Sequence, residues 1–251
     1  VWDGASSQWE AAAGVQVHGV AMCLGARGSS VLVGGKFTAV GDVRAQNVAV
    51  FNGTAWNALG EGVVGEVYAC AMSSAVMYVG GNVGKAGGEE VENVAMWNGK
   101  DWGALLDSEC LHQKRSVCGI NGRVLSMATV GEYLYVGGMF AMAGGKPANN
   151  VARFYSGVWE PLGGGVDGPV TVMSSMRVFG SVSGSCVYIA GEFRKATDLT
   201  GDTDTGGLAR WCVGDPVLVR TVGNRVVSEF WQAVDVPEGV RGIRTMAAHP
   251  I

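Results

Sequence analysis

Apolar residues alternate with small and polar residues in short runs along most of the chain. Four such runs span residues 17–24, 30–34, 48–51 and 55–59, and each has the length of a strand rather than of a helix. Asn52-Gly53 separates the third run from the fourth. This dipeptide favours the tight turn of a β-hairpin, because both central residues of that turn take positive φ. The pattern predicts an all-β chain of antiparallel hairpins.

The same pattern recurs along the sequence. Each copy contains an apolar residue followed by Val-Gly-Gly, then a loop, Asn-Val-Ala, a turn and a tryptophan, and the last copy is degenerate. The copies span residues 31–56, 78–102, 135–159 and 188–211. A repeat of this length, built from strands and turns without a helical stretch, is typical of a β-propeller.

We predict one β-propeller domain over residues 1–251, with five four-stranded antiparallel blades. The complete blades are expected at residues 15–60, 61–106, 107–164 and 165–223. The fifth combines two half-blades, 1–14 and 224–251, and pairing of 1–11 with 243–249 closes the ring. The fourth strand of the fourth blade is assigned to residues 215–218, and a register that uses Trp231 is the alternative. A ring of six to eight blades, completed by strands outside this sequence, is also open, because the shared blade lacks the connection between its second and third strands.

The fullest copy of the motif lies at residues 135–166, where Tyr-Val-Gly-Gly-x-Phe-x-x-Ala-Gly-Gly precedes Asn-Val-Ala-x-Phe and Trp-x-x-Leu-Gly. This motif resembles the kelch-related repeat of galactose-oxidase-like propellers and of fungal and bacterial cell-surface propeller proteins. The resemblance implies an extracellular or surface-exposed propeller and transfers no catalytic residue. A galactose-oxidase-type copper site would need clustered His, Tyr and Cys ligands. The histidines share no position in the repeat; they are His18, His112 and His249.

Composition narrows the choice of partners. The chain has 41 glycines in 251 residues, and they recur at fixed repeat positions, so they are structural. The formal net charge is −4, and no Lys/Arg stripe interleaves with aromatic residues, so nucleic acid is not an expected partner. The apolar runs are far shorter than the roughly 18 residues of a membrane helix.

Two of the six cysteines occupy an apolar position of the repeat. Cys23 and Cys70 lie at the same place in the first strands of neighbouring blades, where the other copies have Met127, Met173 and Phe230. A slot filled by Met and Phe is a buried one, so we expect these two cysteines to be free thiols in the core.

The other four cysteines are predicted to form two disulfides. Cys110 and Cys118 bracket an insertion at residues 109–119, which a disulfide would close. Cys186 begins the second strand and Cys212 ends the third strand of one blade, and an antiparallel pair brings those ends together. Metal binding is the alternative, although the sequence has no C-x-x-C pair. Two disulfides would indicate an oxidising compartment, and hence an extracellular or cell-surface location.

Three further features have a chemical and a structural interpretation. Asn52-Gly53-Thr54 is an N-glycosylation sequon, but it is also the expected hairpin turn. The acids in an enlarged loop could bind Ca²⁺ or form a solvated acidic loop, and no other cofactor is expected; they are Asp198, Asp202 and Asp204. Acids near the first strands could support glycoside hydrolysis, if two of them faced each other; they are Glu66, Asp167 and Glu229.

The departures from the repeat predict where a partner binds. Connections from second to third strands, and from one blade to the next, emerge on one face of a propeller, and the insertions at 106–121 and 194–207 both lie there. We expect partner contacts from Lys114, Arg115, Glu89, Glu90, Asp202 and Asp204. The favoured function is a non-enzymatic extracellular scaffold that binds a protein partner, within a larger assembly. A lectin-like carbohydrate-binding propeller is the alternative, and a carboxylate-dependent glycoside hydrolase the third.

Overall fold

The computed structural model describes residues 15–115, 117–177, 185–213 and 229–234, and elsewhere the backbone of the short strands at 2–3, 8–9, 220–222 and 225–227. This part of the chain consists of antiparallel strands and one short helix. The all-β prediction is confirmed. The predicted pairing partner of the N-terminus, residues 243–249, lies outside the described residues.

Four antiparallel sheets follow one another along the chain. In each of them four strands pair in sequence order, and sheets 1 and 2 include one further short strand each. Sheet 1 contains β3 (Val17–Arg27), β4 (Ser30–Val40), β6 (Val48–Phe51) and β7 (Trp56–Ala58). Sheet 2 contains β8 (Val63–Met72), β9 (Met77–Ala86), β11 (Val94–Trp97) and β12 (Trp102–Ala104). Sheet 3 contains β13 (Arg123–Val130), β14 (Tyr133–Met139), β17 (Val151–Tyr155) and β18 (Val158–Pro161). Sheet 4 contains β20 (Val170–Arg177), β21 (Ser185–Gly191), β24 (Leu208–Val213) and β27 (Phe230–Ala233).

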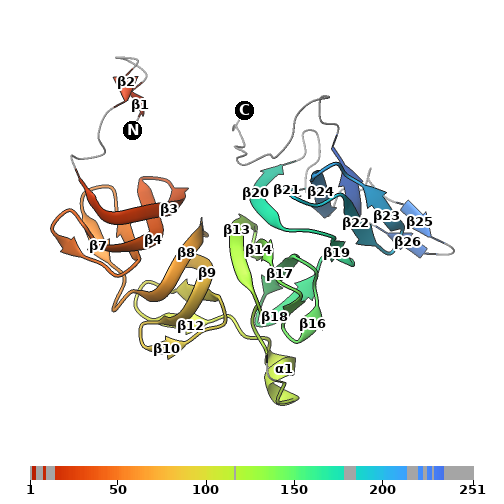
Figure 1. Ribbon diagram of the computed structural model, residues 1–251, viewed down its shortest axis with the longest axis horizontal. Helices are drawn as coiled ribbons and strands as arrows, with labels where there is room; N and C mark the ends of the chain where they lie inside the picture. The colour runs from red at the N-terminus through yellow and green to blue at the C-terminus, as the bar shows by residue number, and fades with distance from the viewer. Residues whose placement is uncertain are drawn as a thin grey trace.

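The sheets are arranged along an arc, with their first strands β3, β8, β13 and β20 on its inner side (Figure 1). At one end of the arc, β1 (Trp2–Asp3) and β2 (Gln8–Trp9) form an antiparallel hairpin, in which Trp2 pairs with Trp9. The described strands leave the arc open between β3 and β20 (Figure 1). A closed five-bladed ring is therefore not part of the described structure.

The connection from the second to the third strand forms a short hairpin, where the sequence predicts a loop. In sheet 2 this hairpin turns at Gly87 and Gly88, whose φ angles of 56° and 88° suit a tight turn. Short strands that pair in these connections are β5 (Val43–Arg44), β10 (Glu89–Glu90), β15 (Met142–Ala143), β16 (Lys146–Pro147), β22 (Lys195–Asp198) and β23 (Gly201–Asp204), and β19 (Gly165–Val166) pairs with β22.

The fourth sheet corrects the predicted register. Its fourth strand is β27, where Trp231 pairs with Trp211 of β24, and not residues 215–218. This pairing matches the aromatic pairs of the other sheets, such as Phe51 with Trp56. The blade boundary at residue 223 and the first strand expected at 226–233 are therefore wrong. The prediction assumed a constant spacing between the tryptophans of successive repeats. The hairpin of β25 (Arg220–Val222) and β26 (Arg225–Val227) lies between the third and fourth strands of this sheet and lengthens the repeat.

A tryptophan in the fourth strand links each sheet to the preceding one. The indole nitrogen of Trp102 donates a 2.7 Å hydrogen bond to the carbonyl of Leu59, just beyond the fourth strand of sheet 1. Leu105 follows Trp102 by three residues and accepts the bond of the next linking tryptophan, so one Trp-x-x-Leu motif contributes to two successive links. The equivalent bonds join Trp159 to Leu105 at 2.9 Å and Trp231 to Leu162 at 3.2 Å.

The asparagine of each Asn-Val-Ala motif forms a second link, to the following sheet. Asn47 has a φ of 64°, and its Oδ1 accepts a hydrogen bond from the Phe37 N–H of its own sheet. Its Nδ2 donates to the carbonyls of Val63 and Gly65 in β8, both at 2.9 Å. The equivalent bonds run from Asn93 to the Ile120 carbonyl at 2.8 Å and from Asn150 to the Val166 carbonyl at 3.0 Å.

The two glycines of each Gly-Gly pair have different functions. A Cβ atom on Gly34 would lie 2.8 Å from the sulfur atoms of both Cys23 and Cys70, so this glycine makes room for the next sheet. A Cβ atom on Gly35 would lie 2.1 Å from the Val20 carbonyl oxygen, at a bulge between β3 and β4.

The structure contains a disulfide that the sequence analysis did not predict. Cys23 and Cys70 are bonded, with Cα atoms 5.6 Å apart, so the prediction of two free thiols is wrong. The two cysteines do not share a repeat position, because Cys23 pairs with Gly34 whereas Cys70 pairs with Val79, one residue further along the repeat. The first strands of neighbouring sheets converge on the inner side of the arc, which brings the two sulfur atoms within bonding distance. The other disulfides are the two predicted ones, Cys110–Cys118 and Cys186–Cys212, with Cα–Cα distances of 5.4 and 4.1 Å.

We expect Trp102→Ala to destabilise the protein by about 3–5 kcal/mol, because it removes a buried aromatic side chain and leaves a cavity. It also leaves the Leu59 carbonyl without its indole donor. Chemical denaturation measures the change, and Tyr155→Ala, at an exposed aromatic residue, is the control. A Trp102→Ala protein as stable as the control would show that the tryptophan is not a packing residue.

Candidate interaction face

We call the end of the sheets with the β5, β10, β15–β16 and β22–β23 hairpins and the sheet-to-sheet connections the interaction face. The other end, with the turns inside each hairpin β3–β4 and β6–β7 and their equivalents, is the opposite face. The largest departure on the interaction face is the insertion between β12 and β13. It contains α1 (Ser108–His112), which protrudes from the outer side of the arc (Figure 1).

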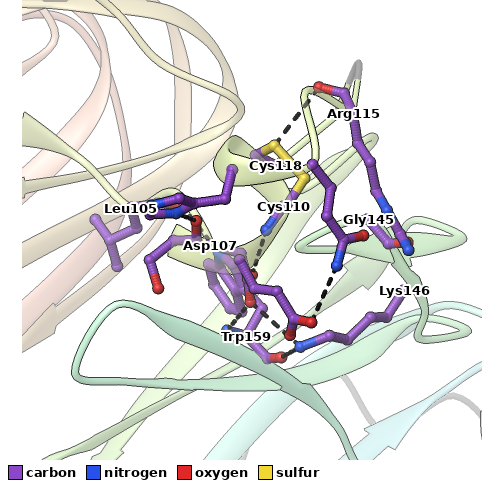
Figure 2. A network of polar contacts seen from close by, with 12 residues as sticks. Leu105, Asp107, Cys110, Arg115, Cys118, Gly145, Lys146 and Trp159 are labelled. Carbon is purple, nitrogen blue, oxygen red and sulfur yellow. Dashed lines mark hydrogen bonds and ion pairs between the residues drawn. A yellow bond between two sulfur atoms is a disulfide. The ribbon is translucent and has the colours of Figure 1, made fainter.

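Asp107 anchors this insertion to sheet 3. It is the N-cap of α1, and its Oδ1 accepts a 3.0 Å hydrogen bond from the Cys110 N–H. Its Oδ2 accepts a 2.9 Å hydrogen bond from the backbone N–H of Trp159 and lies 3.4 Å from the Lys146 Nζ (Figure 2). One fully buried carboxylate thus joins the insertion to the tryptophan that links sheets 2 and 3.

The surroundings of Asp107 keep it charged. Burial is the largest influence on the carboxyl and opposes ionisation, but the N–H donors of Cys110 and Trp159 and the charge of Lys146 outweigh it. The pKa of Asp107 is therefore lowered from its ordinary value of 3.8.

Two further contacts fix the end of the insertion. The Cys110–Cys118 disulfide closes it, and both cysteines are buried. The Nη1 of Arg115 donates a 2.6 Å hydrogen bond to the Gly145 carbonyl in the β15–β16 turn (Figure 2). Arg115, predicted as a partner-binding residue, is thus used to hold the insertion in place.

Asp107, the disulfide and Arg115 together hold the insertion between β12 and β13, which we call the braced insertion. It exposes an apolar residue among charged and polar ones. Leu111 is 51% exposed, and its exposed neighbours include Glu109, His112 and Lys114. Large exposed apolar residues also occur at the interaction-face ends of strands and hairpins elsewhere; they are Val64, Met139 and Leu199.

The predicted acidic residues lie on the hairpins of this face but on separate sheets. Glu89 and Glu90 form β10, where Glu90 makes a 2.7 Å ion pair with Lys85. Asp202 lies on β23, 3.7 Å from the Lys195 Nζ, and Asp204 is exposed on the same strand. No ion pair among the described residues joins these acids to Lys114 or Arg115.

Two of the three aspartates considered for Ca²⁺ have different partners. Asp198 accepts hydrogen bonds from the N–H groups of Thr200 and Trp231, both at 2.6 Å. Asp202 accepts one from the Thr197 hydroxyl at 2.9 Å. No group of three His, Cys, Asp or Glu side chains that could hold a metal ion occurs in the described part of the chain.

The acids considered for glycoside hydrolysis are also dispersed. Glu66 accepts hydrogen bonds from Lys36 and Tyr68, and these two donors lower its pKa. Asp167 accepts from the N–H groups of Arg194 and Lys195. Glu229 forms a 3.0 Å ion pair with Arg153. Each of the three carboxylates therefore has its own separate set of partners.

Two open grooves lie between sheets 1 and 2. The groove at the interaction face has a volume of about 810 Å³, and its lining includes Lys36, Arg44, Glu61, Glu66 and Asn82. The groove at the opposite face has a volume of about 630 Å³, and its lining includes Arg27, Ser29, Ser74, Met77 and Trp97.

Sequence reasoning missed Asp107 and Lys146, which hold the insertion. The Asp-Ser-Glu sequence at 107–109 is a helix-start signal that could have identified Asp107 as a cap. No sequence signal identifies Lys146, because the folding of the β15–β16 hairpin alongside β18 determines its contact with Asp107.

No family model matches the chain, and no curated protein matches it significantly. Among the described residues, no helix has the length and apolar character needed to cross a membrane.

We expect Asp107→Ala to lower the free energy of unfolding by about 1–3 kcal/mol at neutral pH, because it leaves buried donors unsatisfied. Since the folded-state pKa is depressed, the carboxylate's contribution is present above pH 3.8 and is lost as the pH falls through the lower folded-state value. Denaturation of both proteins at a series of pH values should therefore show the difference shrinking at acid pH. A constant difference would contradict the assignment of a buried, charged Asp107.

Proposed function

We propose that this chain is a non-enzymatic, extracellular or cell-surface β-propeller scaffold that binds a protein partner through its interaction face, as a module of a larger assembly. The braced insertion carries the proposal. A buried carboxylate, a disulfide and a side-chain hydrogen bond hold a five-residue helix in place, although the helix itself exposes Leu111 to solvent. Rigid presentation of an apolar anchor lowers the entropic cost of binding.

The repeat and its links support the propeller. Sheets 1–4 are joined in series by the same tryptophan and asparagine bonds, and the β1–β2 hairpin repeats the third- and fourth-strand pairing of aromatic residues. We propose that this hairpin is the outer half of a fifth blade, whose inner strands come from the chain beyond Val234. The kelch-like motif at residues 135–166 agrees with this architecture.

The open end of the arc supports the same conclusion. Leu24 in β3 is 68% exposed, whereas the residues at its position in the other sheets are buried against the first glycine of the Gly-Gly pair in the preceding sheet. They are Cys70, Met127 and Met173. Val20 and Met22 on the same strand are also exposed. A blade that precedes sheet 1 would cover this apolar strand.

The side chains of the interaction face favour a protein partner whose surface has both apolar and charged groups. Leu111 offers an apolar contact, Lys114 a positive charge, and the β10 and β23 hairpins carry carboxylates. Charges of both signs around an apolar anchor determine the orientation of a partner more than the raw affinity. Three disulfides support an oxidising, extracellular setting.

A lectin-like function is the second candidate, and the opposite-face groove favours it. Serine hydroxyls and Arg27 could hydrogen-bond to a sugar there, and the half-buried Trp97 could contact its apolar face. The linking tryptophans are too buried for this purpose. A hydrolase has less support, because its candidate carboxylates are engaged with separate partners.

We expect Leu24→Asp to destabilise the protein by about 3 kcal/mol, the cost of an unpaired charge under a covering blade. The control is Val64→Asp, at a valine that is 52% exposed in β8, and it should cost about 1 kcal/mol through β-propensity alone. Urea unfolding measures both. Equal losses would show that β3 faces solvent and that no blade covers it.

We expect photo-cross-linking residues at positions 111 and 199 to capture one and the same protein on the cells that produce the chain. Positions 100 and 132, in exposed turns of the opposite face, are the controls and should not capture it. Leu111→Asp should then weaken association with that protein at least about tenfold, without lowering the melting temperature. Capture from the control positions, or glycan-array binding without any captured protein, would contradict the proposed face.

A further inference from the structure

The β6–β7 turn of sheet 1 holds an asparagine side chain in a defined conformation. Oδ1 of Asn52 accepts hydrogen bonds from the N–H of Thr54 at 3.0 Å, the hydroxyl of Thr54 at 2.8 Å and the N–H of Ala55 at 2.9 Å. All three residues are exposed. The carbonyl side of the amide is thus occupied by three donors within the turn.

The nitrogen side of the same amide is free. No described residue forms a hydrogen bond with Nδ2 of Asn52, and the side chain lies in solvent. The hydroxyl of Thr54, two residues on, completes the Asn-x-Thr sequence that oligosaccharide transfer requires. The turn therefore combines the acceptor sequence, an accessible nitrogen and a hydroxyl bonded to the amide.

The equivalent turn of sheet 2 provides an internal comparison. Oδ1 of Asn98 accepts hydrogen bonds from the N–H groups of Lys100 at 2.9 Å and Asp101 at 2.8 Å, and the residues of the turn are exposed. Its backbone arrangement matches that of Asn52, but Lys100 stands where Thr54 supplies a hydroxyl. The two turns differ in the feature that decides glycosylation.

We propose that Asn52 carries an N-linked oligosaccharide. Nδ2 attacks the anomeric carbon of an oligosaccharide donor linked to a lipid pyrophosphate. A carbon–nitrogen bond forms, the bond from that carbon to the pyrophosphate oxygen breaks with its electron pair, and Nδ2 loses one proton. The three disulfides indicate the oxidising secretory environment in which this transfer takes place.

The position of Asn52 gives the glycan a structural consequence. The β6–β7 turn lies on the opposite face, and a Cβ on Gly53 would be 2.9 Å from the Ser29 hydroxyl, which also lines the groove with Trp97. A glycan here stands beside that groove and leaves the interaction face clear. The inference is independent of any partner, since it concerns a covalent modification.

Secretion of the chain from cultured animal cells tests the proposal. The secreted protein should decrease in mass on treatment with peptide N-glycosidase, and release in heavy-oxygen water should leave a labelled aspartate at residue 52. Asn52→Gln and Thr54→Ala should each abolish the shift.

A matched gain-of-site variant tests the turn geometry. Lys100→Thr gives the turn of sheet 2 the same Asn-Gly-Thr sequence as that of sheet 1, and it should add a second glycan at Asn98. The double variant Asn52→Gln with Lys100→Thr should carry one glycan, at Asn98 alone. Secreted wild-type protein without a glycan at Asn52 would overturn the proposal, and modification of Asn98 but not Asn52 would overturn it most directly. Retention of every variant inside the cell, with unmodified Asn52, would also count against it.

Discussion

The structure depends on the burial of one tryptophan per sheet across the boundary to the preceding sheet. A single sheet of four short strands cannot cover both of its faces, so each sheet is stable only against its neighbours. Trp102, Trp159 and Trp231 fill these boundaries, and each indole N–H finds a leucine carbonyl of the preceding sheet. Burying a tryptophan without a partner for its N–H would be costly, and the backbone carbonyl supplies that partner. Any residue has such a carbonyl; leucine recurs there because its side chain is buried in the same part of the core as the indole.

The candidate interaction face is attached to this same framework. Asp107 accepts a hydrogen bond from the backbone N–H of Trp159, and Asp198 accepts one from the backbone N–H of Trp231. In two insertions, therefore, a carboxylate supplies the acceptor for a backbone N–H of a fourth strand. The insertion with α1 is therefore a rigid extension of sheet 3 rather than a free loop. Rigidity of this kind suits a recognition element, because little conformational freedom is left to lose when a partner binds.

Acidic residues in this chain show why composition alone identifies sites poorly. Asp198 in the Ca²⁺ candidate and Asp167 in the hydrolase candidate both accept backbone N–H groups. Glu66 accepts donors from two neighbouring sheets. Exposed N–H groups at hairpin turns and edge strands need acceptors, and a carboxylate is a strong one. These acids therefore have a structural role as hydrogen-bond acceptors, and no catalytic or metal-binding role is needed to explain their presence.

The sequence by itself determined the features that repeat: the all-β class, the strands of the first three sheets, the Asn-Gly turns and the disulfides within one loop or one hairpin. These depend on contacts between residues near in sequence, or on a pattern written several times. Tertiary structure decided the rest. The Trp231 register depends on pairing with Trp211 across an inserted hairpin, and Cys23–Cys70 on the convergence of two inner strands. The position of α1 depends on Asp107 meeting Trp159, 52 residues away. Spacing along the chain carries no information about distances that only the packing of one sheet on the next creates.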